Sequence, residues 1–210
     1  MKKIESHFDE LYTLLSSEDF LMRKGVSTEV PFFICHYDAT EQVKSDGVVK
    51  LLVEKLNTRG VKTLHIDLYK IMIEKMRAND DLDWTLENEG TVDHENLLTD
   101  MRAQLNVKTE IAPMIAEMIK SDDYRLVIVT GIGACYPIFE AHELLTNLSE
   151  IVTGVPLVLF FPGDYVQAPG SGASLHLFGR VEGRGYYRAF DIETFLKMNE
   201  IRQSAQGTQS

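Results

Sequence analysis

The feature that most constrains the fold of this 210-residue chain is a series of short apolar runs between residues 125 and 192, each of which ends in a turn. The runs have the length and the β-branched or aromatic content of strands, and the first two end in turns that contain Gly or Pro-Gly. In α/β proteins, functional residues often gather at such strand ends. The four runs are RLVIVTGIGACYP, VPLVLFFPGDY, LHLFG and YYRAFDI.

The first seventy residues predict one helix followed by a βαβ unit. Apolar residues at steps of three and four indicate a helix from Ile4 to Leu15, and a strand is expected from Val30 to Cys35. The turn His36–Thr40 comes next. A helix over Val43–Leu56 is expected to end near Gly60, and Val61–Asp67 then reads as a second strand. Strand, helix and strand at this spacing favour parallel pairing with a right-handed crossover.

The remainder of the chain continues this alternation of helices and strands. Pro113 is expected to mark a break or a new first turn in the helical region from Leu97 to Ile119. The other expected elements are a strand at Leu126–Val129, a helix at Tyr136–Ile151 beginning near Pro137, a strand at Val155–Phe161, and late strands at Leu175–Phe178 and Tyr186–Ile192.

Together, these elements predict one three-layer α/β domain over residues 1–200, with a mainly parallel central sheet flanked by helices. The late strands are expected to be antiparallel at one edge, joined by short loops or a hairpin. Residues 201–210 are expected to form a flexible C-terminal tail.

Composition narrows the function classes. The net charge of −11 argues against a surface that grips nucleic acid, so a basic protein partner is more plausible than DNA. No apolar run approaches the ~20 residues that cross a bilayer, and no secretory signal follows the first lysines, so we expect a cytoplasmic protein. Cys35 and Cys135 lie far apart in the sequence and are expected to be buried free thiols.

The turn Thr130–Pro137 is the place to test for phosphate binding, and it fits neither common template. A Walker A loop requires a lysine, and none occurs between Lys120 and Lys197. The dinucleotide fingerprint requires a small residue where Tyr136 stands. We therefore interpret this segment as a structural turn, and the residues assigned to structural turns are Gly131, Gly133, Pro137, Pro162 and Gly163.

A nucleotide-binding origin is nevertheless conceivable. The order of elements resembles that of P-loop nucleoside-triphosphatases that have lost their catalytic parts, and residues 36–40 stand where such an enzyme would carry its phosphate loop. The chain would then be a degenerate, non-hydrolysing relative without Walker A. This likeness concerns the fold alone and assigns no function.

Acidic side chains near strand ends raise a second enzymatic alternative. Asp38, Asp67 and Asp164 could gather at the carboxyl edge of a parallel sheet and bind a divalent metal through oxygen ligands. Against this, Asp38 and Asp67 sit where aspartate commonly caps a following helix. The six histidines are scattered, and no G-x-S-x-G motif is present. The sequence therefore predicts no catalytic, cofactor-binding or metal-binding residue.

Partner contact is the remaining role for the late part of the chain. Asp164 and Tyr165 follow a buried strand and precede the loop from Gln167 to Ser174, which is expected to be soft, and this arrangement suits an interface anchor. Tyr186 and Arg188 combine residue types that are enriched at protein interfaces. These four residues are the candidate partner interface, and the acidic stretch from Asp80 to Glu95 is a solvated face or an alternative interface.

Several of these strings also resemble the signature of the BrxB family, a small component of bacterial BREX (bacteriophage exclusion) systems. They are TGIG running into Tyr136-Pro137, PLVLFFPGDY from Pro156, YYRAF from Tyr186, PFFI from Pro31 before Tyr37-Asp38, and IDLY from Ile66. The resemblance covers roughly residues 8 to 195.

The resemblance implies a non-catalytic scaffold that bridges larger components and is required for host DNA methylation and phage restriction. The partners implied are a PglZ-like protein of the alkaline-phosphatase superfamily and, through it, the PglX adenine-specific methyltransferase. No cofactor is implied, and the sequence leaves open whether the chain forms a homodimer.

Overall fold

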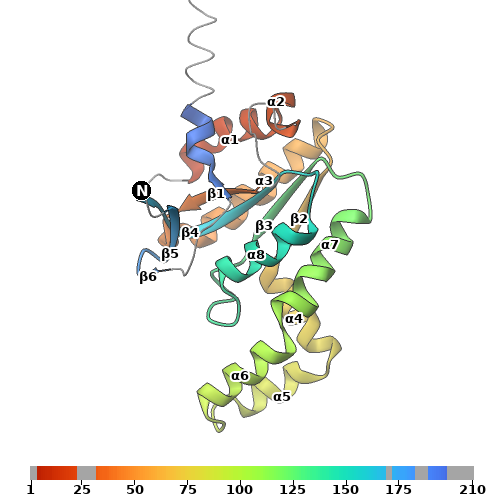
Figure 1. Ribbon diagram of the computed structural model, residues 1–210, viewed down its shortest axis with the longest axis vertical. Coiled ribbons are helices and arrows are strands. Elements are labelled where there is room, and N and C mark those ends of the chain that lie inside the picture. Colours follow the sequence, from red (N-terminus) through yellow and green to blue (C-terminus); the bar gives the residue numbers. More distant parts are fainter. Residues whose placement is uncertain (1–3, 23–31, 169–171, 183–188, 198–210) are drawn as a thin grey trace, which may run out of the picture.

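A five-stranded parallel sheet forms the centre of the molecule. The computed structural model describes residues 4–22, 32–168, 172–182 and 189–197. The strand order is β2-β3-β4-β1-β7, and every neighbouring pair in this order is parallel. Helices cover both faces of the sheet, so the predicted three-layer α/β architecture is confirmed (Figure 1). The strands are β1 (Phe32–Tyr37), β2 (Thr63–Asp67), β3 (Leu126–Thr130), β4 (Leu157–Ala168) and β7 (Ala189–Asp191).

Alternation along the strands divides the core into two apolar layers. In β1, Phe32 and Ile34 contribute to one core cluster, whereas Phe33 and Cys35 contribute to the other. All four side chains are buried, because β1 lies between β4 and β7 and has helices on both faces. The short, nearly continuous apolar runs of the sequence are thus the interior strands of a parallel sheet.

The N-terminal and C-terminal helical segments share one face with the helix that follows β1. A 3₁₀ turn, η1 (Ile4–His7), leads into α1 (Phe8–Leu15), and the short α2 (Glu18–Leu21) follows. After a second 3₁₀ turn, η2 (Ala39–Glu41), comes α3 (Gln42–Thr58). A helical turn at residues 192–197 completes this layer, with the Phe195 ring 5.1 Å from that of Phe33.

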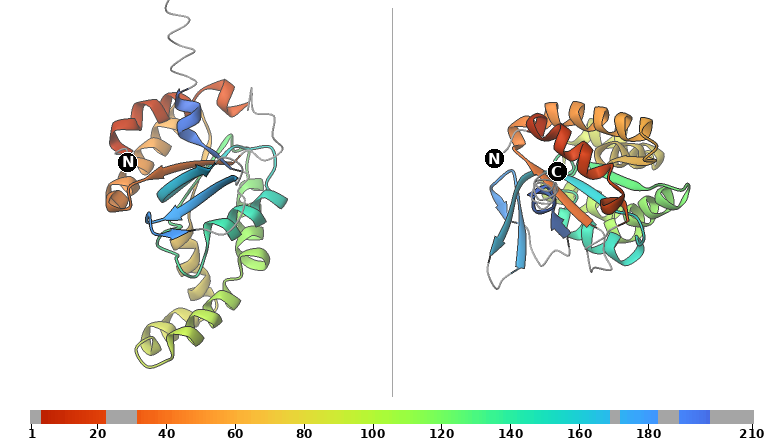
Figure 2. Two further views of the ribbon diagram at one scale, coloured as in Figure 1. Left: turned by 60° about the vertical axis from the view of Figure 1, so that its left-hand side comes forward. Right: turned by 90° about the horizontal axis from the view of Figure 1, so that it is seen from above.

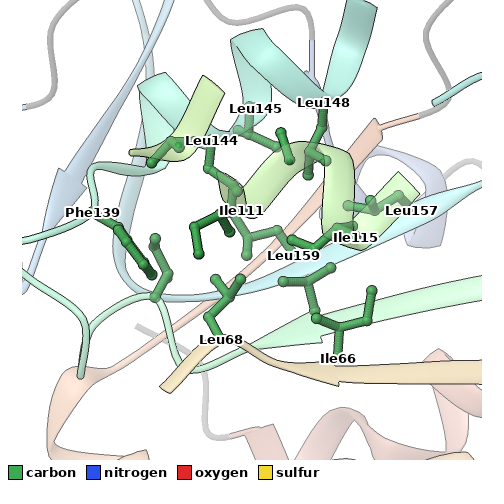
Figure 3. Packing of buried hydrophobic residues seen from close by; sticks show 14 of the residues in the cluster. Ile66, Leu68, Ile111, Ile115, Phe139, Leu144, Leu145, Leu148, Leu157 and Leu159 are labelled. Atoms are coloured by element: carbon green, nitrogen blue, oxygen red, sulfur yellow. The ribbon is translucent and has the colours of Figure 1, made fainter. Parts of the chain in front are cut away.

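The opposite face carries α4 (Leu68–Ala78), α7 (Ala112–Lys120) and α8 (Ala141–Ile151). Leu144, Leu145 and Leu148 of α8 pack over β4 together with residues of the π-helical turn η3 (Val107–Ile111) and of α7 (Figure 3). Pro113 lies in the first turn of α7, which confirms the predicted new helix start.

Two further helices extend away from the sheet. They are α5 (Asp81–Asn88) and α6 (His94–Gln104), which lie beyond the end of α4 (Figure 1, and Figure 2, left). We call residues 79–104 the arm. Few of its side chains are buried, since α5 buries only Thr85 and α6 buries only Leu97. The acidic stretch of the sequence is therefore a helical projection.

The second half of β4 leaves the main sheet as a hairpin. Residues 157–162 pair in parallel with β1, whereas Gly163–Ala168 pair antiparallel with β5 (Gly172–Leu177). The short β6 (Val181–Glu182) then pairs with β5. The prediction of a soft loop from Gln167 to Ser174 is wrong over its described residues, because they continue the antiparallel pairing of β4 with β5. The expected antiparallel pairing occurs here, whereas the edge strand β7 is parallel to β1.

Two predicted boundaries also shift. The expected turn at His36 is wrong, because β1 continues through Tyr37. The helix expected from Tyr136 begins only at Ala141. Residues 131–140, which we call the β3 turn, instead fold back on themselves, with the Phe139 amide donating to the Cys135 carbonyl. The β3 turn buries Ile132, Cys135 and Phe139 at spacings of three and four, which imitates the apolar spacing of a helix.

Candidate functional site

The most distinctive surface lies where the β3 turn meets the base of the hairpin. In parallel α/β sheets, ligands commonly bind outside the carboxyl ends of the strands. Here β3 ends in the β3 turn, and β4 continues directly into the hairpin. The contacts between the β3 turn and the hairpin therefore determine how much space is left for a ligand at this edge of the sheet.

Gly163 allows the hairpin to close tightly over the end of the sheet. A Cβ atom placed on Gly163 would lie 2.1 Å from the His176 carbonyl oxygen and 2.9 Å from Cε1 of Phe161. No side chain fits between these atoms, so the pairing of β4 with β5 at this point requires glycine. The residue predicted as a structural turn is thus the point at which β4 leaves the parallel sheet.

Gly133 brings the β3 turn against the same place. A Cβ atom on Gly133 would lie 2.6 Å from Cγ of Pro162 and 3.2 Å from Cε1 of Phe178. Beside this contact, the rings of Tyr136 and Phe178 pack edge to face with their centroids 6.3 Å apart. Both rings remain accessible, with 37% of Tyr136 and 41% of Phe178 exposed.

Asp164 lies next to this aromatic pair. Its side chain is half-buried, and its Oδ2 atom is 3.1 Å from the point where a Cβ atom of Gly179 would stand. Gly179 directly follows Phe178 in the turn between β5 and β6. We define Tyr136, Asp164 and Phe178 as the hairpin-base surface. It combines two exposed aromatic rings and a carboxylate on a support of paired strands, which are features of protein interfaces.

The other predicted interface residues fall elsewhere. Tyr165 is half-buried against the core, and its hydroxyl donates to the Ala189 carbonyl of β7 at 3.2 Å. This contact gives Tyr165 a structural role at the sheet edge, and its role in partner contact stays a prediction. Tyr186 and Arg188 lie outside the described residues.

The N-terminus of α4 lies at the same edge of the sheet and is capped by a side chain of the protein. Asp67 Oδ1 accepts hydrogen bonds from the Tyr69 and Lys70 amides at 3.1 and 3.2 Å. Gly131 covers this cap, because its φ of 85° and its position leave a Cβ atom only 2.9 Å from Asp67 Oδ1. The amides that would hold a phosphate are therefore bound by Asp67 and covered by the β3 turn.

The remaining strand-end carboxylate also serves a local cap. Asp38 Oδ1 accepts hydrogen bonds from the Thr40 hydroxyl and amide at 2.6 and 2.9 Å, which lowers the pKa of Asp38. Among the described residues, no group of three or more His, Cys, Asp or Glu side chains is placed to hold a metal ion. Asp38, Asp67 and Asp164 thus form no such group in that part of the chain.

Buried titratable groups surround the edge without forming a reactive set. His65 Nε2 lies 3.0 Å from the Thr130 hydroxyl, and burial lowers the pKa of His65. Burial, together with the nearby Asp67 carboxylate, raises the pKa of Cys135 to about 12. Burial likewise raises the pKa of Tyr37 to about 12, and the Tyr37 hydroxyl donates to Gln42. Both cysteines are free and buried, as predicted.

Sequence reasoning missed Tyr136 and Phe178 as surface residues. Tyr136 was expected to begin a helix, and Phe178 to end a strand. Phe178 instead has a left-handed φ of 56° in the turn after β5. The available signal was the LFG string, because a glycine after an apolar run marks a turn.

The fold and this surface define a class: a small three-layer α/β protein whose fourth strand extends from the parallel sheet into an antiparallel hairpin. A family model, described as BREX protein BrxB, matches residues 64–192, which run from β2 through β7. The chain belongs to the BrxB family, and it is thus a component of the BREX systems of phage defence.

Two relatives extend the similarity over most of the chain. A BREX protein BrxB of Bacillus cereus (strain H3081.97) is 29% identical over 196 residues, which cover 91% of this chain and 98% of the relative. A BREX protein BrxB of Escherichia coli O9:H4 (strain HS) is 27% identical over 189 residues, which cover 90% of this chain and 91% of that relative. No solved structure matches the chain, so kinship with P-loop proteins stays a hypothesis.

Within the described part of the chain, no helix is both long enough and apolar enough to cross a membrane.

Proposed function

We propose that this chain is a non-catalytic adaptor that joins larger proteins of a BREX system. Through these contacts it supports host DNA methylation and phage restriction without performing either step. The family resemblance names the partners: a PglZ-like protein of the alkaline-phosphatase superfamily and, through it, the PglX methyltransferase. Because host DNA is the target of the system, we place the adaptor in the cytoplasm.

One observation carries this proposal: the edge of the sheet where an α/β enzyme would bind its ligand is filled by the protein itself. Gly133 lies against Pro162 and Phe178, and Gly131 covers the Asp67 cap of α4. The hairpin-base surface is accessible at this edge, with 37% of Tyr136 and 41% of Phe178 exposed. Exposed aromatic rings on a rigid support favour the burial of a partner over the chemistry of a small substrate.

The competing hypothesis is a degenerate nucleotide-binding switch or a metal-dependent enzyme that uses strand-end acids. It requires phosphate or metal ligands at the same edge. There Asp38 and Asp67 accept cap hydrogen bonds from the backbone, and the nearest amides are covered. We therefore favour the adaptor.

The test is co-expression of the chain with the other proteins of its BREX operon, followed by affinity capture. Wild type is expected to retain the PglZ-like protein. The double variant Asp164→Lys/Phe178→Asn is expected to bind it at least ~30-fold more weakly, the loss of about 2 kcal/mol expected for an interface anchor. Asn suits position 178 because it tolerates the left-handed conformation.

Two control variants make the result interpretable. Leu51→Gln changes an exposed apolar residue on α3, away from the hairpin, and should leave capture unchanged. Tyr165→Phe removes the hydrogen bond to Ala189 but keeps the ring, so it reports structural loss at the sheet edge. If the double variant melts like wild type and still binds fully, the interface lies elsewhere. If wild type retains no BREX component, the adaptor role fails.

A further inference from the structure

The arm concentrates most of the net charge of the chain. Residues 79–101 contain eight carboxylates and no lysine or arginine, whereas the whole chain has a net charge of −11. All eight are exposed except Asp81, which is half-buried. None forms an ion pair with a described basic side chain. The carboxylates are those of Asp80, Asp81, Asp83, Glu87, Glu89, Asp93, Glu95 and Asp100.

The single tryptophan of the chain stands in the middle of this charge. Trp84 lies on α5 with 51% of its surface exposed. On α5, Asp81 precedes it by three positions and Glu87 follows three positions later, so both are its neighbours on the helix, and Asp80 stands directly before the helix as its N-cap residue. A large aromatic side chain close to several carboxylates combines apolar contact area with a strongly negative environment.

The body of the protein holds the arm in place. The Arg102 side chain, near the end of α6, donates to the Pro137 carbonyl from Nε at 3.1 Å and from Nη2 at 2.6 Å. Pro137 belongs to the β3 turn, and Leu82 and Met101 pack against the core from the two arm helices. Trp84 is thus presented on helices that are tied to the sheet, which reduces the entropy lost on binding.

Charge decides which occupant fits this surface. A second copy of the chain would bring two sets of carboxylates together, and a nucleic acid would bring phosphates to them. A cationic protein surface gains from both features, because lysine and arginine pair with the carboxylates and a guanidinium can stack on the Trp84 ring. A positively charged protein partner is therefore favoured over a second copy of the chain and over a nucleic acid.

We propose that the arm is a docking surface for a cationic, arginine-bearing patch on a protein partner, with Trp84 as its apolar anchor. The inference rests on the proposed adaptor function and adds to it a second contact surface, distinct from the hairpin-base surface. An adaptor requires two such surfaces to hold two proteins at once.

The test uses the full-length chain labelled with 5-fluorotryptophan, which has one fluorine resonance because Trp84 is the only tryptophan. Each purified, unlabelled component of the same BREX operon is added separately. We expect one cationic component to shift or broaden this resonance, and its affinity to fall at least tenfold between 50 and 300 mM salt, as for charge-driven binding.

A matched pair of variants separates a local site from overall charge. Asp80→Asn/Asp83→Asn/Glu87→Gln removes three exposed charges within four positions of Trp84 and is expected to weaken binding at least tenfold. Glu54→Gln/Glu117→Gln/Glu150→Gln removes three exposed charges from α3, α7 and α8 and is expected to leave affinity within about twofold. Equal weakening by both triples would overturn the proposal, since net charge alone would then explain binding.

The remaining outcomes distinguish the two proposals. If affinity capture shows a complex but no component affects the Trp84 resonance, the arm proposal fails and the adaptor role stands. If no component is captured at all, the adaptor role fails and the arm has no partner to hold. If the resonance changes when the chain alone is concentrated, the occupant is a second copy and the proposal is overturned.

Discussion

At the scale of single residues, burial controls the ionisation of several side chains near the sheet. His65 lies on β2, where desolvation outweighs the attraction of the Asp67 carboxylate and lowers its pKa. At the far side of the sheet, burial raises the pKa of Asp191, which lies 3.7 Å from His36 Nε2. The charged forms of both groups are therefore less favourable in the folded protein than in water.

His65 is expected to make the protein sensitive to mild acid. The unfolded state takes up a proton as the pH falls through 6.5, whereas the folded state resists protonation because its His65 pKa is lower. The free energy of unfolding should therefore be highest above pH 6.5 and decrease as the pH falls below it. Thermal melting at pH 7.5 and 5.5 measures this decrease.

The variant His65→Gln provides the comparison, because glutamine can still bond to Thr130 but does not titrate. Its melting temperature should fall less than that of wild type between the two pH values. Asp191 acts in the opposite direction, since a raised carboxyl pKa favours the folded state as the pH falls, but it contributes equally to both proteins. Equal decreases would show that His65 does not control this response.

The two thiols are expected to be unreactive in the folded protein. Burial raises the pKa of Cys135 to about 12 and that of Cys35 well above its usual range, so almost no thiolate is present at pH 8. A thiol reagent such as DTNB should therefore modify the native chain no faster than it unfolds, and modify both cysteines in denaturant. Rapid labelling of the native protein would contradict this expectation.

At the scale of elements, β4 has the most demanding role. Its first half pairs with β1 and β3 in the parallel sheet, and its second half pairs with β5 in the hairpin. Gly163 stands at the change between the two halves, where its missing side chain lets the His176 carbonyl approach. The stability of the hairpin base therefore depends on Gly163, because a residue with a side chain at this position would prevent the close approach of β5.

Substitution of this glycine is expected to be costly. Gly163→Ala places a methyl group 2.1 Å from a backbone oxygen of β5, so the ladder must shift, at a cost of at least about 2 kcal/mol. The melting temperature should then fall by roughly 4–8 °C for a domain of this size. Calorimetry measures both quantities.

Gly47→Ala is the matched control. Gly47 lies inside α3 with no atom within 4 Å of an added Cβ, so alanine should stabilise the helix by about 0.5–1 kcal/mol. If both substitutions have the same effect, the close approach at Gly163 does not determine stability.

The elements also show which parts of the structure the sequence could predict. Strands β1, β3 and the first half of β4 follow from uniform apolar runs, which are typical of the interior of a parallel sheet, whereas β2 mixes apolar and polar residues and lies at the end of the strand order. The hairpin could not be predicted in this way, because Gly163 is equally compatible with the end of a strand. The helix expected from Tyr136 begins only at Ala141, because residues 136–140 belong to the β3 turn. The aromatic pair of the site depends on these two segments meeting, which no local pattern encodes.

At the scale of the whole molecule, charge is distributed unevenly. The arm carries eight carboxylates and Arg102, a net charge of −7 out of the −11 of the whole chain, so the remainder has a net charge of −4 by the same count. The arm is thus the most acidic part of the protein. Repulsion of polyanions should be strongest at the arm.

This distribution predicts weak binding to nucleic acid. An acidic chain without a stripe of cations releases few counterions, so duplex DNA should bind only poorly at physiological salt. A mobility-shift titration of the isolated chain measures this affinity. Sub-micromolar binding with a steep dependence on salt would contradict the prediction.

The isolated chain is also expected not to hydrolyse ATP or GTP. The lysine of a Walker A loop is missing, and the amides at the α4 N-terminus are bonded to Asp67. Phosphate release in the presence of magnesium should remain at background. Turnover that disappears in Asp164→Asn would instead support the enzymatic alternative and remove the basis for the adaptor.

The position of β1 in the sheet has a consequence for how the protein is made. Both neighbours of this early strand, β4 and β7, are translated about 120 and 150 residues later. At about 5–20 residues per second, the newly synthesised apolar strand waits roughly 6–24 s for its first neighbour. During that time an unpaired, aggregation-prone edge is attached to the ribosome. A nascent chain of this family should therefore depend on chaperones until β4 emerges, which limits how quickly a cell can assemble a defence that relies on it.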